Sequence, residues 1–537
     1  MQNEFRIWGP PGCGKTTTLT KQIHAEAAAA GSESVLVCSL TNTAAAEIGG
    51  RNSTINPDHV GTLHSICFRL LNRPVVADDP KVLVRWNEQF PVYQLTLKKG
   101  RGGGDDGGTT VSAGATRGDH LYQTYQVLRA QMVPQSAWLP HVRAFAAEWE
   151  NWKKSEGAID FSDMLSHVLE QHIPPPQGIT IGFLDEAQDF DRLALTLFRQ
   201  WGQQLDRIVI ASDDDQCLFS FRGSDPAALL EVEIPDDHTH VLSQSYRLPR
   251  AVHTVVQRWI ERVQHRQPKT YLPRDAEGTV QTSSATLRTP EQLLPHIRAS
   301  LDEGRSVMLL AACGYMLNGV KAMLKKYGLS YHNPWRPERH DWNPLAQTRG
   351  VSATERVLAF LGPDPAIQRG NQRMTWTAQE VKTWTEAVRT DGVLHRKMRS
   401  VLDTLEGHRE VTLAELQSWL LPEALDAALA LDLDWFGSVL LAEKRRAMAY
   451  PITVAERTGP EALVDTPLIT LGTIHSTKGG ESSHVILFPD LPPSSAYEWE
   501  RHNRDAIVRQ FYVGMTRARD TLTICNPASS ACVKGLL

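Results

Sequence analysis

Short apolar runs, each followed by a polar, acidic or glycine-containing turn, recur along this chain and alternate with segments of helical periodicity. Runs of this kind are typical of buried parallel strands, whose carboxyl ends hold ligands. The runs form an early group and a late group: Phe5–Trp8, Val35–Leu40, Ile179–Leu184 and Arg207–Ala211, then Val307–Ala312, Leu468–Ile474, Val485–Phe488 and Thr521–Cys525. The alternation predicts an α/β fold built on parallel sheets.

Two long stretches interrupt this alternation, and we expect each to be an inserted domain. The first, residues 71–155, is mixed in pattern and contains a loop at Lys98–His120 that is rich in Gly, Thr and Ser. The cations at the start of that loop suit either a contact with a phosphate backbone or a solvated linker: Lys98, Lys99 and Arg101. The second stretch, residues 335–463, is helical in pattern, and we interpret its tryptophans as helix-packing core rather than a base-stacking array: Trp376, Trp384, Trp419 and Trp435.

Residues Gly9 to Thr16 match the phosphate-binding pattern G-x-x-x-x-G-K-[ST], and they lie between a strand-like and a helix-like segment. Glycines let successive backbone N–H groups surround a phosphate, and the N-terminus of the following helix adds a partial positive charge. Lys15 supplies a full charge, and the Thr16 hydroxyl can reach a magnesium ion. The pattern predicts a nucleotide site formed by Gly9, Pro10, Pro11, Gly12, Cys13, Gly14, Lys15, Thr16 and Thr17.

A second acidic element follows the apolar run that ends at Leu184, where the chain reads Asp185-Glu186-Ala187-Gln188-Asp189. In phosphate-loop ATPases the first acid holds magnesium and the second polarises the attacking water. An acidic turn at a strand end is common without any catalytic role. Because a phosphate loop is present in the same chain, we favour the catalytic interpretation, with Asp185 and Thr16 as magnesium ligands and Glu186 as the base.

The composition limits the number of domains, the kind of nucleic-acid contact and the cellular location that we expect. The 537 residues suffice for three to four domains, and the net charge of -5 excludes a generally basic coat, so any nucleic acid must bind in a local groove. The seven cysteines are scattered without a C-x-x-C pair, which favours reduced thiols and a cytoplasmic location. Since no apolar run reaches membrane-spanning length, we expect no membrane partner.

Further segments carry a resemblance to a known family, and they occur in that family's order. Their sequences include Thr-Asn-Thr-Ala-Ala-Ala-Glu at 41–47, Gly-Thr-Leu-His-Ser at 61–65, Asp-Phe-Ser-Asp at 160–163, Asp-Asp-Asp-Gln-Cys-Leu-Phe-Ser-Phe-Arg-Gly at 213–223, Gln-Ser-Tyr-Arg at 244–247, Thr-Ile-His-Ser-Thr-Lys-Gly-Gly-Glu at 473–481 and Tyr-Val-Gly-Met-Thr-Arg-Ala-Arg at 512–519. With the phosphate loop and the acidic element, the chain resembles superfamily 1 DNA helicases of the UvrD/Rep/PcrA type.

This resemblance implies two RecA-like parallel-sheet motor domains, each with a mainly helical insertion. The first motor domain is expected at residues 1–70 and 156–245, with its insertion at 71–155. The second motor domain is expected at residues 246–334 and 464–537, with its insertion at 335–463.

The resemblance also implies roles for single residues. Arg247 and Arg517 would act as arginine fingers on the γ-phosphate, although an arginine by itself is more often part of a surface ion pair. Gln216 would couple the nucleotide to DNA, Tyr246 would stack on the nucleotide base and Glu481 would contact the ribose.

Single-stranded DNA would be held by a separate set, in which flat side chains stack on bases regardless of sequence. A purely structural interpretation also remains open for this set: the phenylalanines can pack in the hydrophobic core, and a lone histidine more often has a structural role. The implied DNA-binding residues are Asn42, Thr62, His64, Phe219, Phe221, Arg222 and His475.

The expected function is that of an ATP- and magnesium-dependent DNA helicase that translocates on single-stranded DNA and acts at single/double-strand junctions in replication, repair or recombination. The resemblance implies 3′→5′ polarity and leaves room for a protein loading partner. Two alternatives stay open: a translocase that displaces proteins with little unwinding, and a non-motor phosphate-loop NTP-binding protein. Members of the resembled family usually carry an upstream glutamine that reads adenine; here only eight residues precede Gly9, and Gln2 is too close to it to serve, so we expect weak discrimination between ATP, dATP and GTP.

Overall fold

The computed structural model of this chain describes residues 3–40, 55–96, 116–346, 350–362, 376–405, 407, 409–501 and 504–537. The segment with Asn42 and the cations Lys98, Lys99 and Arg101 lie outside the described residues. The predictions made for these residues therefore stay predictions.

The first sheet is built from six short strands in the order β3-β2-β6-β7-β1-β8. Neighbouring strands run parallel, with Phe5 opposite Val209 and Val35 opposite Ile181. Strands β2 and β6 are buried along their whole length, as their continuous apolar runs predict. The bounds are Glu4–Trp8 for β1, Val35–Ser39 for β2, Val60–Thr62 for β3, Ile181–Leu184 for β6, Arg207–Ser212 for β7 and Thr239–Val241 for β8.

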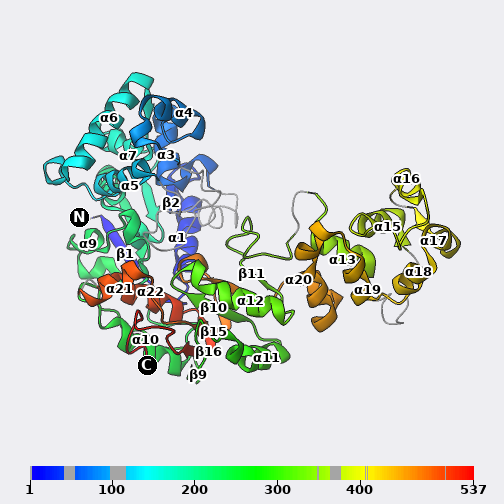
Figure 1. The fold of residues 1–537 in the computed structure, drawn as a ribbon. Helices are drawn as coiled ribbons and strands as arrows, with labels where there is room; N and C mark the ends of the chain where they lie inside the picture. The colour runs from blue at the N-terminus through cyan, green and yellow to red at the C-terminus, as the bar shows by residue number, and fades with distance from the viewer. Residues whose placement is uncertain are drawn as a thin grey trace. The chain divides into compact units, whose positions relative to one another are not determined.

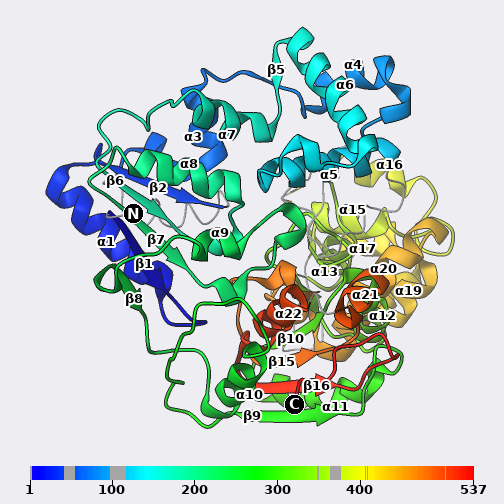
Figure 2. The ribbon, with the colours of Figure 1, turned by 90° about the vertical axis from the view of Figure 1, so that its left-hand side faces the viewer.

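The second sheet also has six strands, in the order β11-β14-β10-β15-β16-β9, and Figure 2 shows β16 beside β9. Strand pairs β11–β14 and β15–β16 run parallel. The bounds are Thr279–Ser283 for β9, Val307–Ala311 for β10, Tyr331–His332 for β11, Ile469–Thr473 for β14, Ser482–Leu487 for β15 and Ala518–Cys525 for β16. The two sheets confirm the predicted α/β fold, and every predicted strand is present with its ends shifted by three residues at most.

Backbone contacts divide the chain into two compact units, residues 1–282 with 473–537 and residues 283–472. The first unit contains α1 (Lys15–Ala30), α3 (Leu63–Leu70), α4 (Pro80–Gln89), α5 (Arg117–Ala130), α6 (Pro140–Glu156), α7 (Phe161–Glu170), α8 (Arg192–Gly202), α9 (Pro226–Leu230), α10 (Arg250–Ile260), α21 (Pro493–Glu500) and α22 (Asp505–Met515). Two further strands there, β4 (Val75–Val76) and β5 (Ala158–Ile159), pair with each other. The predicted division into two motor domains and two insertions stays a prediction.

The second unit contains nine described α-helices, which Figure 1 shows. They are α11 (Leu294–Asp302), α12 (Asn318–Lys326), α13 (Ala353–Leu361), α15 (Ala378–Thr385), α16 (Met398–Asp403), α17 (Leu413–Trp419), α18 (Pro422–Leu429), α19 (Leu433–Val439) and α20 (Ala442–Thr458). Strands β12 (Trp376–Thr377) and β13 (Glu410–Val411) form a two-stranded antiparallel sheet.

The tryptophans of the second unit pack between its helices. Trp376, Trp384 and Trp419 are buried. Trp435 is half-buried and stacks on Phe360, with ring centroids 6.3 Å apart. These contacts confirm the interpretation of this tryptophan set as helix-packing core.

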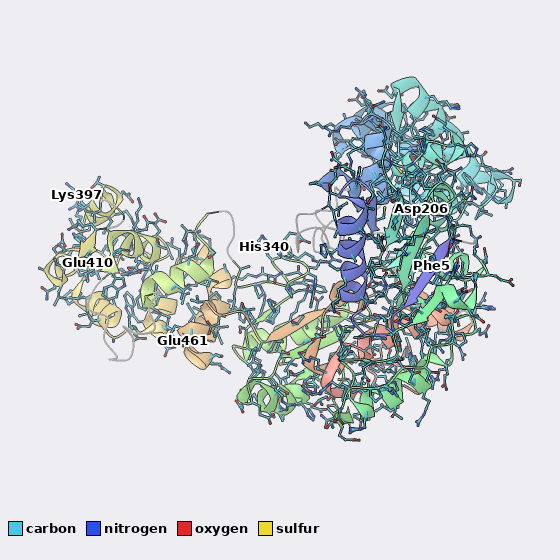
Figure 3. All side chains as sticks on the ribbon, turned by 180° about the vertical axis from the view of Figure 1, so that it is seen from behind. Phe5, Asp206, His340, Lys397, Glu410 and Glu461 are labelled. Carbon is cyan, nitrogen blue, oxygen red and sulfur yellow. The ribbon has the colours of Figure 1, made fainter. Side chains whose placement is uncertain are left out.

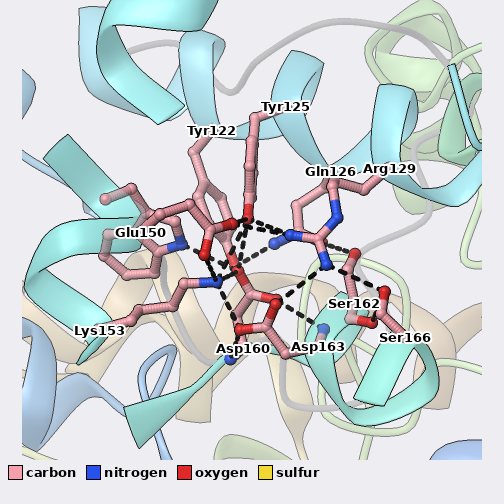
Figure 4. Close-up of polar contacts among 11 residues, drawn as sticks. Tyr122, Tyr125, Gln126, Arg129, Glu150, Lys153, Asp160, Ser162, Asp163 and Ser166 are labelled. Carbon is pink, nitrogen blue, oxygen red and sulfur yellow. Dashed lines mark hydrogen bonds and ion pairs between the residues drawn. The ribbon is translucent and has the colours of Figure 1, made fainter. Parts of the chain in front are cut away.

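A buried network of charges joins α5, α6 and α7 in the first unit (Figure 4). Lys153 of α6 lies 2.8 Å from the Asp160 carboxylate and also pairs with Asp163. The Asp160 carboxylate accepts the Asp163 N–H, and the Asp163 carboxylate accepts the Asp160 N–H. Together these two bonds form a capping box at the start of α7. Arg129 of α5 lies 3.0 Å from the Asp163 carboxylate. The network therefore determines the direction in which α7 begins.

Candidate nucleotide and nucleic-acid site

The loop between β1 and α1 places the predicted phosphate-binding residues at the carboxyl end of the first sheet. The Gly9 N–H donates to the Ser212 carbonyl at 2.9 Å, which ties the loop to the end of β7. Gly12 and Gly14 have φ values of 74° and 77°, in the left-handed region that glycine adopts without steric cost. Pro10, Pro11 and Cys13 are buried in the loop, and Thr17 is exposed on α1.

The two charged elements of the predicted ATPase site meet at this loop. Lys15 is 7% exposed, and its Nζ lies 3.1 Å from Glu186 Oε1. The Thr16 hydroxyl donates to Asp185 Oδ2 at 3.2 Å. Residues 169 positions apart in the chain are thus brought together, as the combination of loop and acidic element predicts.

Burial and neighbouring charges shift the pKa values of Asp185 and Glu186 in opposite directions. Burial of the carboxyl, with Glu186 beside it, raises the pKa of Asp185 to about 6. Burial alone would raise the pKa of Glu186 as well, but Lys15 and Lys478 lower it to about 2. Glu186 is therefore ionised at neutral pH and can accept a hydrogen bond from water.

The oxygen donors at the loop suit a hard divalent cation. Magnesium prefers carboxylate and hydroxyl oxygens and usually keeps several waters. The Thr16 hydroxyl and the Asp185 carboxylate provide such a pair at hydrogen-bond distance. The donor chemistry fits the magnesium ligands predicted from the sequence, which remain a prediction.

Arg517 follows α22 and is fully buried beside Gln216, the glutamine predicted to couple the nucleotide to DNA. Its Nη2 donates to Gln216 Oε1 at 3.0 Å, and its Nε donates to the Val513 carbonyl at 2.9 Å. Burial and the nearby Arg247 lower the pKa of Arg517, but from so high a value that the group stays charged at neutral pH. A fixed cation thus lies beside Gln216.

Tyr246 and Arg247 lie against the phosphate loop, and Glu481 pairs with Arg247. The Tyr246 N–H donates to the Gly12 carbonyl at 2.8 Å, and the tyrosine ring is 70% exposed. Arg247 Nε lies 2.8 Å from Glu481 Oε2, and Arg519 lies 3.2 Å from the other oxygen of that carboxylate. The structure therefore places the predicted finger, base-stacking and ribose-contact residues side by side.

Gly12 is a point where the loop and the Arg247 segment pack without room for a side chain. An added Cβ would overlap the Cβ of Arg247 and lie 3.0 Å from its backbone nitrogen. We expect Gly12→Ala to lower the free energy of unfolding by about 1–3 kcal/mol and to weaken nucleotide binding. Chemical denaturation and nucleotide titration measure the two effects.

Gly31→Ala is the matched control for this variant. Gly31 also has positive φ, 97°, but no heavy atom lies within 4 Å of an added Cβ. Its alanine variant carries the backbone strain without the overlap. Equal losses of stability in both variants would show that the contact with Arg247 has no effect.

The predicted DNA-stacking residues gather on one patch of the first unit. The Arg222 guanidinium lies 5.5 Å from the ring centroids of both Phe219 and Phe221. The His475 ring meets the Phe221 ring edge-on at 5.8 Å, and its Nε2 lies 3.2 Å from the Leu218 carbonyl. Phe219 is buried, whereas Phe221 is partly exposed, so Phe221 alone of the two presents an accessible ring.

Thr62 and His64 lie at the start of α3, on another part of the same unit. The Thr62 hydroxyl accepts the Ser65 N–H at 3.2 Å and thereby caps the helix, so this side chain has a structural role. Burial lowers the pKa of His64 to about 4, which keeps the imidazole neutral. The His64 ring meets the half-exposed Phe161 ring edge-on at 5.8 Å.

Three residues join the site that sequence reasoning left without a role. Gln188 donates to Glu186 and accepts the Asp213 N–H at 2.9 Å. Lys478 pairs with Asp189 and donates to the Gln216 carbonyl at 3.1 Å. The third is Phe161, whose ring contacts the ring of the predicted site residue His64. All three lie inside segments that carried the family resemblance, and that position was the available signal.

The sequence of this chain is similar to those of known proteins. Residues 1–235 match the family model of the UvrD/REP helicase N-terminal domain. The chain is 24% identical over 258 residues to the putative ATP-dependent DNA helicase YjcD of Bacillus subtilis, covering 44% of this chain and 34% of that protein.

Two further relatives carry similar names. The identity is 24% to ATP-dependent DNA helicase UvrD1 of Mycobacterium leprae (44% of this chain, 35% of that protein) and 23% to ATP-dependent DNA helicase PcrA of Bacillus subtilis (50% and 39%). The chain thus spans between 34% and 39% of the length of these three relatives. Among the described helices, none has both the length and the apolar character needed to cross a membrane.

Proposed function

We propose that this chain, whose residues 1–235 belong to the UvrD/REP helicase family and which is a distant homologue of the UvrD and PcrA DNA helicases, is itself an ATP-dependent DNA helicase. In this proposal it translocates on single-stranded DNA with 3′→5′ polarity and unwinds duplex DNA at single/double-strand junctions. The named relatives and the ATPase-like site support it.

One observation carries the proposal: contacts run without interruption from the phosphate loop to the aromatic patch. Lys15 pairs with Glu186, which accepts a hydrogen bond from Gln188. The adjacent Asp189 pairs with Lys478, whose Nζ also lies over the Phe219 ring, 5.4 Å from its centroid. A change at the nucleotide therefore has a physical route to the residues proposed to hold DNA.

Hydrolysis at this site would transfer the γ-phosphoryl group of ATP to water. Ionised Glu186 accepts a hydrogen bond from the attacking water and orients it. Lys15 and the guanidinium groups of Arg247 and Arg517 oppose the negative charge that grows on the phosphoryl oxygens as the bond to ADP breaks. Magnesium, held by Thr16 and Asp185, would neutralise part of the phosphate charge.

Coupling to movement would use Gln216. Its Oε1 accepts from Arg517, and its backbone carbonyl accepts from Lys478. Loss of the γ-phosphate would free Arg517 to change partners, and the aromatic patch, which begins three residues further along the chain, would shift with Gln216. Two grips on the strand that tighten alternately would then produce stepping.

Phe221→Ala tests the DNA side of this proposal. We expect it to weaken single-strand affinity by about 1–3 kcal/mol with little dependence on base sequence, because a partly exposed ring can stack on any base. Fluorescence anisotropy with oligonucleotides of different sequence measures this effect. The neighbouring Phe219→Ala is the control, because Phe219 is buried and its loss should lower the melting temperature. A Phe221→Ala variant that melts early but binds DNA normally would assign Phe221 to the core.

The overall function is tested by ATPase assays with and without single-stranded DNA, followed by unwinding of duplexes tailed at either end. The proposal expects DNA-stimulated hydrolysis and unwinding from a 3′ tail only. Stimulated hydrolysis with displacement of bound protein but no unwinding would favour the translocase. Absence of DNA stimulation would overturn the motor function altogether.

A further inference from the structure

A basic groove of about 780 Å3 lies within the second unit, between the end of α12, the start of α13 and the first turns of α20. Its lining contains no Asp or Glu among the described residues. The basic side chains of this groove are Lys325, Lys326, His340, Arg356, Lys444 and Arg446, of which His340 is labelled in Figure 3.

These cations are not balanced by neighbouring acids within the described part of the chain. None of the six forms a salt bridge there, and the buried Arg356 Nη1 has no hydrogen-bond partner. Asp341 attracts Lys325, but its carboxylate is already bonded to Lys321 at 2.7 Å and to Arg339 at 3.2 Å. A buried guanidinium N–H without a partner costs free energy, which an acceptor in the groove would remove.

Electrostatics within the groove add to this imbalance. Burial lowers the pKa of Lys325, repulsion from Lys321 and Arg446 lowers it further, and attraction by Asp341 offsets only part of this shift. Lys444 lies in the first turn of α20, where the helix dipole disfavours a cation. An anion would relieve both effects.

We propose that this groove binds the phosphodiester backbone of nucleic acid, at a site separate from the ATPase site and the aromatic patch. The lining suits recognition of the backbone, because its several long cations can each pair with a phosphate and no acid in the described lining opposes them. The inference rests on the proposed function only in taking nucleic acid, rather than another polyanion, as the ligand.

The test compares full-length chains that carry Lys325→Gln with Arg446→Gln against chains that carry Arg288→Gln with Lys397→Gln. The control removes two exposed cations of the same unit that do not line the groove, and Lys397 is labelled in Figure 3. Affinities for a blunt hairpin duplex and for an oligothymidine of equal length are measured over a range of salt concentrations. Melting temperatures verify that each variant folds.

For the groove variant we expect affinity to fall roughly tenfold, and the slope of log affinity against log salt to become shallower by roughly 2, one phosphate contact per cation removed. A loss of affinity for the hairpin identifies duplex DNA as the ligand of the groove, and a loss of affinity for the oligothymidine identifies single-stranded DNA. The control should match the wild type.

Unchanged affinity and slope for both probes would overturn the inference, and so would equal losses in groove and control variants. Failure of the proposed function has a different signature. In that case the wild-type chain itself shows no DNA-stimulated ATPase activity, whatever the groove variant does.

Discussion

Replacing Arg247 with alanine is expected to slow DNA-stimulated ATP hydrolysis by roughly a thousandfold or more, while nucleotide affinity stays within about tenfold of the wild type. The guanidinium lies beside the phosphate loop and is held there by Glu481 at 2.8 Å. A charge that acts mainly on the transition state contributes more to turnover than to binding. Steady-state kinetics with saturating single-stranded DNA, together with nucleotide titration, separate the two.

Arg517 is tested by a conservative substitution, because its guanidinium is buried and donates hydrogen bonds to Val513, Gly480 and Gln216, all of which alanine would remove. Arg517→Lys keeps the charge and removes the planar fork, so turnover should fall while the fold remains. Arg250→Ala is the matched control, since Arg250 forms an exposed pair with Asp275. Wild-type hydrolysis in Arg247→Ala and Arg517→Lys would refute the mechanism in which both arginines serve one nucleotide.

Lys153→Met is expected to lower the free energy of unfolding by about 3–5 kcal/mol, because it leaves the buried carboxylates of Asp160 and Asp163 without their main counter-charge. Lys153 is 2% exposed and Asp160 is 0% exposed, so water cannot replace the lost partner without local opening. Methionine preserves most of the side-chain volume, which isolates the charge effect. Chemical denaturation followed by tryptophan fluorescence measures the change.

Lys154→Met provides the control for this substitution. Lys154 is the next residue on α6 and is exposed, so the same change should cost little. A Lys153→Met variant as stable as Lys154→Met would show that the network in Figure 4 contributes no net stability.

Much of the fold and site was predictable because it depends on local patterns. Continuous apolar runs such as Val35–Ser39 identify buried parallel strands in any context. The glycine spacing of the phosphate loop is required by local backbone geometry, and the expected helix follows it as α1, Lys15–Ala30. The pairing of Asp185 with Thr16 follows from parallel strands of one sheet, β6 and β1 on either side of β7, whose carboxyl ends lie at the same edge.

Other features depend on contacts between distant segments, which no local pattern encodes. The difference in burial between Phe219 and Phe221, two similar residues two positions apart, arises from what packs over each ring. The role of Lys478 appears only once it meets Asp189, 289 positions away in the chain.

The chain alone was thus sufficient for the α/β class, the phosphate loop, the acidic element and the family resemblance, because strand burial and phosphate binding impose short-range requirements on residue type. Tertiary structure decided which charges are compensated. Lys153 lies among carboxylates, whereas Lys325 and Arg356 face a groove without acids. Electrostatic balance depends on distances through space and on burial, and both are set only when the segments have packed.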